Sequence, residues 1–239
     1  MSSSSIANKP VPKAETIEPD AAEPVLHASI YEELRRRMIT GKIVPGVGLS
    51  TRGLALEMGV SQMPVRDALS RLAAEGAVEI RSKRRIEVPA MNADRFTDLL
   101  ECRLMLEPKA AVLALPQITP ARLKHLREVD AAIDAAMENG DVVAYMEGNF
   151  AFHFGLYRAN ERPTLNRLIE ALWLQFGPFM RVVYGRFGTA NLVDQHRIAL
   201  EAIEANDAAA LERAIASDIA DGMGLIGRST WPNTEGGGA

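Results

Sequence analysis

The sequence predicts a mostly helical protein, with three helices and a small β-hairpin at its N-terminal end and an all-α helical bundle after them. Hydrophobic residues make up 47% of the chain but aromatic residues only 5%, so aliphatic side chains must fill the cores. Apolar positions recur at helical spacing over most of the chain. Only residues 78–88 show the alternation of apolar and charged residues that is typical of paired strands.

Composition divides the chain into two domains between two short tails. Residues 1–24 are rich in Ser, Pro, Ala and Glu without a hydrophobic period, so we expect a disordered tail there and a loose tail over residues 229–239. Residues 25–90 form the first predicted domain and residues 92–228 the second. The formal net charge is −4 overall but +4 over residues 25–89. A basic block joined to an acidic one favours a nucleic-acid-binding module fused to a different module.

Three helices begin the first domain. The first is predicted over residues 25–40, where apolar residues recur every four positions. Ser50 is placed to cap a short second helix that ends at Gly59. Ser61 is placed to cap a third helix over about residues 62–75.

A change of period predicts a β-hairpin after the third helix. Val78 and Ile80 alternate with charged residues, and so do Ile86 and Val88. The predicted tip, residues 81–85, carries four positive charges in five residues. Three helices followed by such a hairpin are the parts of a winged helix-turn-helix.

The first domain also carries residues suited to reading DNA. Gln62, Met63 and Arg66 occupy the exposed start of the third helix, and Gln and Arg pair with base edges in the major groove. A basic hairpin tip suits phosphates or the minor groove. The alternative is a set of solvated charges on a small helical domain, but the ordered combination of turn, helix and basic hairpin favours DNA.

This domain resembles the winged helix of the GntR family over about residues 27–89. The resemblance rests on Pro45-Gly46, Leu54-Ala55, Gly59-Val60-Ser61, Pro64-Val65-Arg66, Ala68-Leu69 and Glu75-Gly76. It implies DNA contacts by Arg52, Arg66 and the wing. Together with the start of the recognition helix, the predicted DNA-binding residues are Arg52, Ser61, Gln62, Met63, Arg66, Lys83, Arg84 and Arg85.

Two departures from the family pattern predict an altered operator sequence. The family's recognition helix usually begins Ser-Arg-Thr-Pro, whereas this chain has Ser61-Gln62-Met63-Pro64. Arg85 stands where the wing tip usually has Gly. We therefore do not expect the family's base contacts to carry over at positions 62 and 63.

The second domain is predicted to be helical throughout, and four of its helices carry polar residues within apolar stripes. The helices are expected near residues 93–115, 120–138, 141–159, 164–186, 191–205 and 208–226. The polar residues within the stripes are Arg103, Asn149, His153, His196 and Asp218. Since a buried polar group without a partner costs about 1–3 kcal/mol, these helices are expected to meet one another at these residues. Imidazoles with a carboxylate in a bundle core are typical of metal sites. Two alternatives stay open, because a lone buried histidine is often satisfied within the core and Arg103 can pair with Glu107.

Residues 95–220 look like the all-helical FCD sensor domain of the FadR subfamily. The shared landmarks are Arg103…Glu107, Asn149-x3-His153 and His196-Arg197. Many members bind a divalent metal through an Asp, a His four residues later and two further His. Here Asn149 replaces that Asp and Asp218 stands where the last His usually lies. With these replacements, Asn149, His153, His196 and Asp218 could still hold zinc, manganese or nickel, which accept nitrogen and oxygen ligands. The alternative is a site that has lost its metal, in which Asp218 pairs with one of the imidazoles and the effector contacts His153 and His196 directly.

Taken together, these features predict a cytoplasmic transcriptional regulator that binds a pseudo-palindromic double-stranded DNA operator as a homodimer. A small-molecule effector is expected to control this binding, and we predict a carboxylate because the guanidinium of Arg103 suits one. The predicted effector contacts are Arg103, Asn149, His153 and His196. Cys102 is the single cysteine, which fits a reducing compartment.

Two other functions compete with the regulator. The first is a helical metal-dependent enzyme that uses His153, His196 and Asp218, but the sequence offers no identifiable nucleophile or general base for it. The second is a structural DNA-binding protein without an effector, which gives no account of the polar residues in the second domain.

Overall fold

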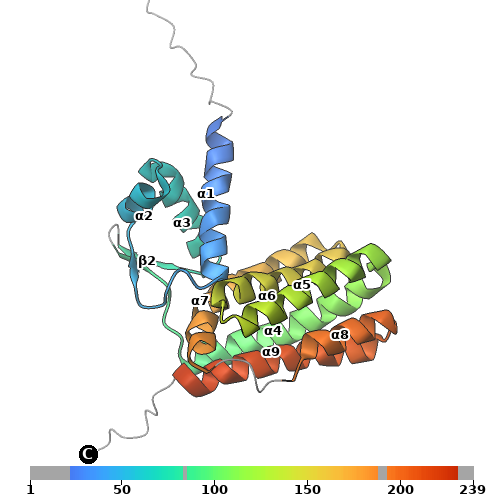
Figure 1. Ribbon diagram of the computed structural model, residues 1–239. Coiled ribbons are helices and arrows are strands. Elements are labelled where there is room, and N and C mark those ends of the chain that lie inside the picture. Colours follow the sequence, from blue (N-terminus) through green and yellow to red (C-terminus); the bar gives the residue numbers. More distant parts are fainter. Residues whose placement is uncertain (1–21, 83–84, 188–192, 231–239) are drawn as a thin grey trace, which may run out of the picture.

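The computed structural model describes residues 22–82, 85–187 and 193–230 of the chain, and these form two domains (Figure 1). The helices are α1 (Ala22–Ile39), α2 (Thr51–Met58), α3 (Gln62–Ala74), α4 (Ala93–Ala114), α5 (Pro120–Glu138), α6 (Val142–Tyr157), α7 (Pro163–Phe187), α8 (Gln195–Glu204) and α9 (Ala208–Thr230). The strands are β1 (Gly48–Leu49), β2 (Glu79–Ser82) and β3 (Arg85–Glu87), and short 3-10 turns follow α4 and α6. The predicted mostly helical fold is confirmed.

Helix α1 is the central support of the first domain. Its apolar stripe, which includes Ile30, Leu34 and Met38, is buried and packs on α3. The helix begins at Ala22, so residues 22–24 belong to it and not to the tail in which we expected them. Pro24 does not prevent this, because a proline in the first turn of a helix removes an N–H that has no partner there.

The sheet of the first domain has three strands where the sequence predicted two. Its order is β1-β3-β2, and both neighbouring pairs are antiparallel. Strand β1 escaped prediction because two residues are too few to show an alternating pattern. Ile86 is buried, whereas Ile80 is 47% exposed, so the hairpin presents only part of its apolar alternation to the core.

Helices α2 and α3 meet at a tight turn. Ser50 caps α2 by accepting a hydrogen bond from the backbone N–H of Gly53. Gly59 ends α2 in the left-handed conformation at φ +67°, which favours glycine. Ser61 occupies the N-cap position of α3 as expected, but its side chain makes no capping hydrogen bond.

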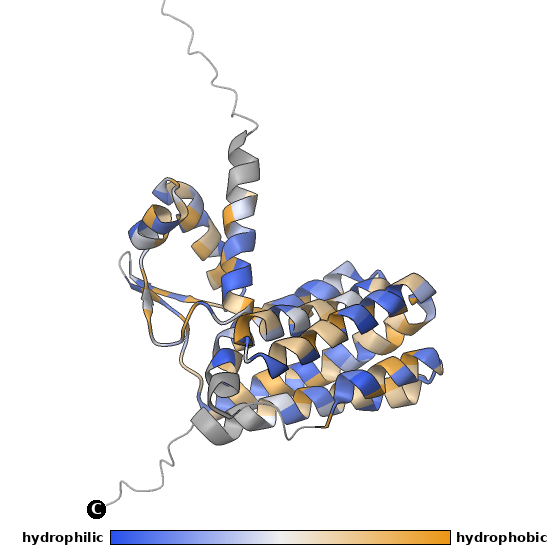
Figure 2. Ribbon diagram, viewed as in Figure 1, coloured by the Kyte–Doolittle hydropathy of each residue, from blue (hydrophilic) through white to orange (hydrophobic). Residues whose placement is uncertain are grey.

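The second domain is a bundle of α4–α9, with α4 against α9 and α5 against α6 (Figure 1). Thr119, Asp141 and Asp207 each accept a hydrogen bond from a backbone N–H in the first turn of the following helix. Large aromatic side chains fill the centre. Figure 2 shows hydrophobic and hydrophilic residues alternating along the helices of the bundle. No helix in the described part of the chain combines the length and apolar character needed to cross a membrane.

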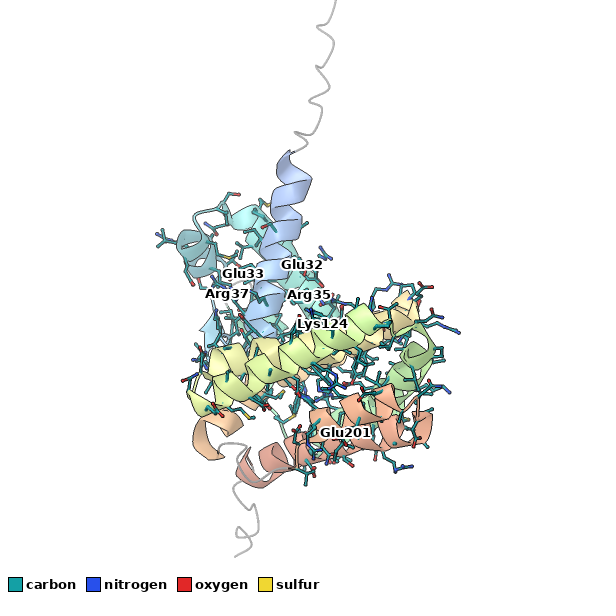
Figure 3. The ribbon with its side chains drawn as sticks, turned by 45° about the vertical axis from the view of Figure 1, so that its right-hand side comes forward. Glu32, Glu33, Arg35, Arg37, Lys124 and Glu201 are labelled. Atoms are coloured by element: carbon teal, nitrogen blue, oxygen red, sulfur yellow. The ribbon has the colours of Figure 1, made fainter. Side chains whose placement is uncertain are left out.

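The C-terminal end of α1 joins the two domains by packing on α6 and α7. Arg35 on α1 donates to Glu170 on α7 at 2.8 Å, and Figure 3 shows Arg35 on the part of α1 that faces the bundle. The two helices approach closely at Gly177, where a Cβ would lie 2.8 Å from the Ile39 Cα and the Met38 carbonyl oxygen. Helix α7, which lines the bundle core, is thus also in direct contact with the first domain.

Candidate functional site: a recognition helix and a buried histidine–aspartate cluster

The first turn of α3 is held in place by its own apolar residues. Pro64 and Val65 are buried, together with Ala68, Leu69 and Leu72 further along the helix. Their burial turns the opposite face of α3 outward, and this face carries Gln62 and Arg66.

The structure brings the predicted DNA-binding residues of α2 and α3 to the surface. Arg52, Ser61, Gln62, Met63 and Arg66 are all exposed, and Met63 is 57% exposed. An exposed methionine with no core to fill is suited to an apolar contact with a thymine methyl group. Because the Ser61 hydroxyl does not cap α3, it is available to a phosphate oxygen.

The described wing residues form ion pairs within the hairpin. Arg81 Nε lies 2.6 Å from Glu87 Oε1, and Arg85 Nε lies 3.0 Å from Glu87 Oε2. Both arginines remain exposed, so these pairs are weak and can exchange for phosphate contacts. Lys83 and Arg84, which the sequence also assigned to DNA, lie outside the described residues.

Three helices of the bundle bring two imidazoles and a carboxylate together. His153 lies on α6, His196 on α8 and Asp218 on α9. The two Nε2 atoms are 3.3 Å apart, and His153 Nε2 lies 3.1 Å from Asp218 Oδ2. Both histidines are buried, and the ligand atoms of all three residues lie within 4.8 Å of one another. The sequence therefore identified residues that the fold brings to one point.

Hydrogen bonds on the far side of each ring fix which nitrogen carries the proton. Tyr157 donates its only hydroxyl proton to Glu107 Oε2 at 3.0 Å, so its oxygen accepts from His153 Nδ1 at 2.9 Å. Asp130 Oδ1 lies 3.3 Å from His196 Nδ1 and can only accept. Both neutral imidazoles therefore present an Nε2 lone pair to the shared point.

The shared point consequently collects only electron-pair donors. Two Nε2 lone pairs and an Asp218 oxygen repel one another unless a proton or a metal cation lies among them. The pKa of His196 responds in this direction: burial lowers it, but the hydrogen bond to Asp130 and the charges of Asp218 and Asp130 outweigh burial and raise it above its usual value. Burial raises the pKa of Asp218, but a hydrogen bond from His153 and the positive charges of the two protonated imidazoles outweigh burial and lower it to about 2.

Asn149 lies one helical turn before His153 on the same face of α6. The residue is only 5% exposed, and no hydrogen bond joins its side-chain amide to another of the described residues. A buried amide with unused donors and acceptors is suited to a ligand. Its predicted role in metal and effector binding stays a prediction.

Glu107 is the hub behind His153, and sequence reasoning named it only as a possible partner of Arg103. It accepts from Arg103 at 2.5 Å, from Tyr157 at 3.0 Å and from the Trp173 indole at 3.0 Å. The Arg103 guanidinium also lies over the rings of Trp173 and Phe176. The alternative of an Arg103–Glu107 pair is thus realised. An effector role for Arg103 stays a prediction, and in this geometry it acts through Glu107.

A small cavity of about 130 Å³ opens beside His196 and Asp218. Residues of α5, α8 and α9 form most of its wall, and Asp130 and Asp134 lie on its α5 side. Burial and the neighbouring charges of Asp130 and Asp194 raise the pKa of Asp134. The cavity gives a small molecule access to the histidine–aspartate cluster.

Helix α7 contacts both the cluster and the first domain. Trp173 binds Glu107, and Gln175, two residues later, donates to the Glu75 carbonyl at 3.1 Å. Glu75 directly follows the recognition helix. Arg95, at the start of α4, donates to both Gln175 and the Gly76 carbonyl. A shift of α7 would therefore reach the end of α3 directly.

Two family models match the sequence, one in each domain. The model described as "Bacterial regulatory proteins, gntR family" matches residues 26–88. The model described as "FCD domain" matches residues 98–221, which is more than half of the chain.

Curated relatives and solved structures extend this similarity over both domains. The "HTH-type transcriptional regulator McbR" of Escherichia coli (strain K12) is 29% identical over 76% of this chain and 84% of its own length. An uncharacterized HTH-type transcriptional regulator from an unstable DNA locus of Streptomyces ambofaciens is 30% identical over 74% of this chain and 75% of its own length. The solved structure of E. coli McbR/YncC has a TM-score of 0.80 at 27% identity, covering 85% of this chain and 97% of the other.

Proposed function

We propose that this chain, which belongs to the GntR family of bacterial regulatory proteins and has an FCD domain after its helix-turn-helix, releases its operator when a small organic acid binds the FCD domain. Members of this family are DNA-binding transcriptional regulators. The family is one of regulators, so the alternative of a metal-dependent enzyme is set aside. The observation that carries the proposal is the convergence of His153, His196 and Asp218 beside a cavity.

For operator binding, we propose that the start of α3 reads bases while the wing holds phosphates. Gln62 and Arg66 are exposed and have long polar side chains suited to base edges. Contacts to the phosphates of the DNA backbone are assigned to Arg52, Ser61 and the wing residues Lys83, Arg84 and Arg85. Because one recognition helix reads only a few base pairs, a homodimer on a pseudo-palindromic site supplies the remaining specificity.

For the sensor, the donor set suits a divalent ion that prefers nitrogen and oxygen ligands, namely zinc, manganese or nickel. His153, His196 and Asp218 would hold it, and Asn149 could add a carbonyl oxygen. The ion would supply a Lewis-acidic position to which an effector carboxylate can bind. Asp130 and Tyr157 support this by keeping the Nδ1 protons of His196 and His153 engaged and both Nε2 lone pairs free.

The route from sensor to operator is proposed to run through α7. Effector binding that displaces Trp173 would also move Gln175, which bonds to the segment that follows α3. The joint leaves Arg35 Nε, Glu75 Oε2 and Arg95 Nε buried without partners among the described residues. Unpaired buried polar atoms raise the free energy of this domain arrangement. A modest effector-binding energy can therefore shift the protein toward another arrangement of the two domains.

Selection of bound sequences from random DNA, with and without candidate acids, tests the proposed function. We expect an enriched site with two inverted half-sites, and we expect an active acid to reduce its recovery. A single unpaired half-site would contradict the dimer, and recovery that no acid alters would contradict control by an organic acid.

A further inference from the structure

The cavity beside the histidine–aspartate cluster is strongly acidic. Five aspartates contribute to its wall, from α5, α9 and the residue before α8. They are Asp130, Asp134, Asp194, Asp218 and Asp221. Among the described residues, no lysine or arginine lines the cavity.

The inner two of these carboxylates already have partners. Asp218 lies against His153, and Asp130 lies against His196. The outer three have only weak partners: Asp194 caps α8 and lies 3.7 Å from the exposed Arg197 Nε, Asp221 accepts from the Gln195 amide at 3.3 Å, and Asp134 forms no ion pair within 4 Å with another of the described residues. A simple carboxylate entering the cavity would meet an excess of negative charge before it reached the cluster.

The inner end of the cavity, at His196, is suited to positive charge. His196 is 8% exposed and lines the cavity, and its Nε2 faces only His153 Nε2 and Asp218, neither of which donates a proton to it in the neutral state. Because Asp130 and Tyr157 engage the two Nδ1 protons, the facing Nε2 atoms of His196 and His153, 3.3 Å apart, have no proton to share when both rings are neutral. This arrangement does not depend on the aspartates at the mouth. It calls for a cation at the inner end, and a cation held there attracts an anionic group of a ligand.

We propose that the effector is an amino carboxylate, whose carboxylate binds at the His153–His196–Asp218 end and whose ammonium group lies among Asp134, Asp194 and Asp221. This inference rests on the proposed function and narrows its organic acid to one class. The two charges of such a ligand match the two ends of the cavity, whereas an unsubstituted acid matches only one. Ile133, Met137 and Val193 also line the cavity, so an aliphatic body suits the space between the charged groups. The cavity volume of about 130 Å³ restricts the ligand to a small molecule.

Calorimetric titration of the zinc-loaded full-length protein tests the proposal. The probes are straight-chain 2-amino and terminal amino acids of three to six carbons, each paired with its hydroxy acid and with the amine that lacks the carboxylate. We expect at least one amino acid to bind about tenfold or more tightly than its hydroxy partner, and the lone amine to bind more weakly than the amino acid.

Asp134→Asn provides the test of the ammonium site, and Asp98→Asn is its control. Asp98 is an exposed aspartate on α4 that does not line the cavity. We expect the preference for the amino acid over its hydroxy partner to shrink at least about threefold in Asp134→Asn and to stay unchanged in Asp98→Asn. Circular dichroism and zinc content confirm that both variants are folded and loaded.

The outcomes separate this inference from the proposed function. Hydroxy acids that bind as tightly as amino acids and release operator DNA would overturn the amino carboxylate while leaving the organic-acid regulator intact. An unchanged preference in Asp134→Asn would overturn the assigned ammonium site. Binding of neither kind of acid would overturn both proposals.

Discussion

At the scale of single residues, Tyr157 links Glu107 to His153 and fixes the tautomer of the ring. Tyr157→Phe removes the oxygen that accepts from His153 Nδ1, so both tautomers of His153 become accessible. We expect zinc affinity to fall about 10–100-fold, measured by competition with a chromophoric chelator. Tyr31→Phe is the matched control, because Tyr31 is also buried and donates to a glutamate, but in the first domain. Equal zinc affinity in Tyr157→Phe and wild type would contradict the positioning role.

The titration of the cluster predicts a maximum of stability in the metal-free protein. The raised pKa of His196 contributes stability that is fully present below about pH 6.5 and is lost as the pH rises through its folded value. The lowered pKa of Asp218 contributes stability that is present above about pH 4 and is lost as the pH falls toward about 2.

Thermal unfolding of chelator-treated protein against pH measures this maximum. We expect the melting temperature to decline from about pH 6.5 upward in wild type, and this decline to be weaker in His196→Gln. Zinc should reverse the trend, since protons and metal compete for the same nitrogens. A wild-type melting temperature that rose between about pH 6 and 8 without metal would contradict the assigned network.

The sequence predicted the members of the cluster but not the residues that orient them. His153, His196 and Asp218 were identifiable because each interrupts an apolar stripe on its own helix. Asp130 and Trp173 have no such signal, because they act across helices and no sequence spacing encodes a contact between helices. Tyr157 lies four residues after His153, so its position on the same face was available as a signal.

At the scale of secondary-structure elements, α3 and the wing are expected to contribute to DNA binding in different ways. Arg66→Ala should weaken binding to the selected operator by about 1–3 kcal/mol while changing binding to random DNA little, because it removes a base contact. Neutralising Lys83, Arg84 and Arg85 together should weaken binding to all sequences and reduce the salt dependence, by up to about 0.9 in the log–log slope for each phosphate that the wing no longer neutralises. Fluorescence anisotropy at several salt concentrations measures both. A triple variant with the wild-type slope would show that the wing does not touch phosphate.

The close contact of α1 with α7 predicts a strong effect at Gly177. Gly177→Ala places a methyl group against the α1 backbone, so the joint must open, at a cost of about 1–3 kcal/mol in unfolding free energy. Gly53→Ala in α2 is the control, because its Cβ meets the Ser50 Cβ at an ordinary 3.5 Å and alanine favours the helix. Urea unfolding should show the destabilisation only in Gly177→Ala, and equal stability of the two variants would contradict the close contact.

The elements themselves were largely predictable, and the exceptions have physical causes. Helix positions follow from apolar spacing and from caps such as Ser50, Thr119 and Asp141, all of which form. Strand β1 and the early start of α1 were missed. Two residues cannot show a period, and a polar, proline-containing first turn has the composition of a tail.

At the scale of the whole molecule, the two domains differ in charge as they differ in proposed function. The basic first domain presents α3 and the wing, and the acidic second domain holds the cavity with its aspartates. The arrangement of the two domains could not be predicted from the sequence, because it depends on pairs such as Arg35–Glu170 and Gln175–Glu75, which lie far apart along the chain.

Control of DNA binding by the buried cluster of the second domain is the central claim. The most direct measurement is the affinity for the selected operator, with and without the strongest-binding acid, in wild type and in the His153→Ala, His196→Ala double variant. We predict that the acid weakens wild-type binding, whereas the double variant retains operator affinity, has no bound metal and does not respond to the acid. A double variant that is metal-free and still releases DNA with the acid would contradict the claim.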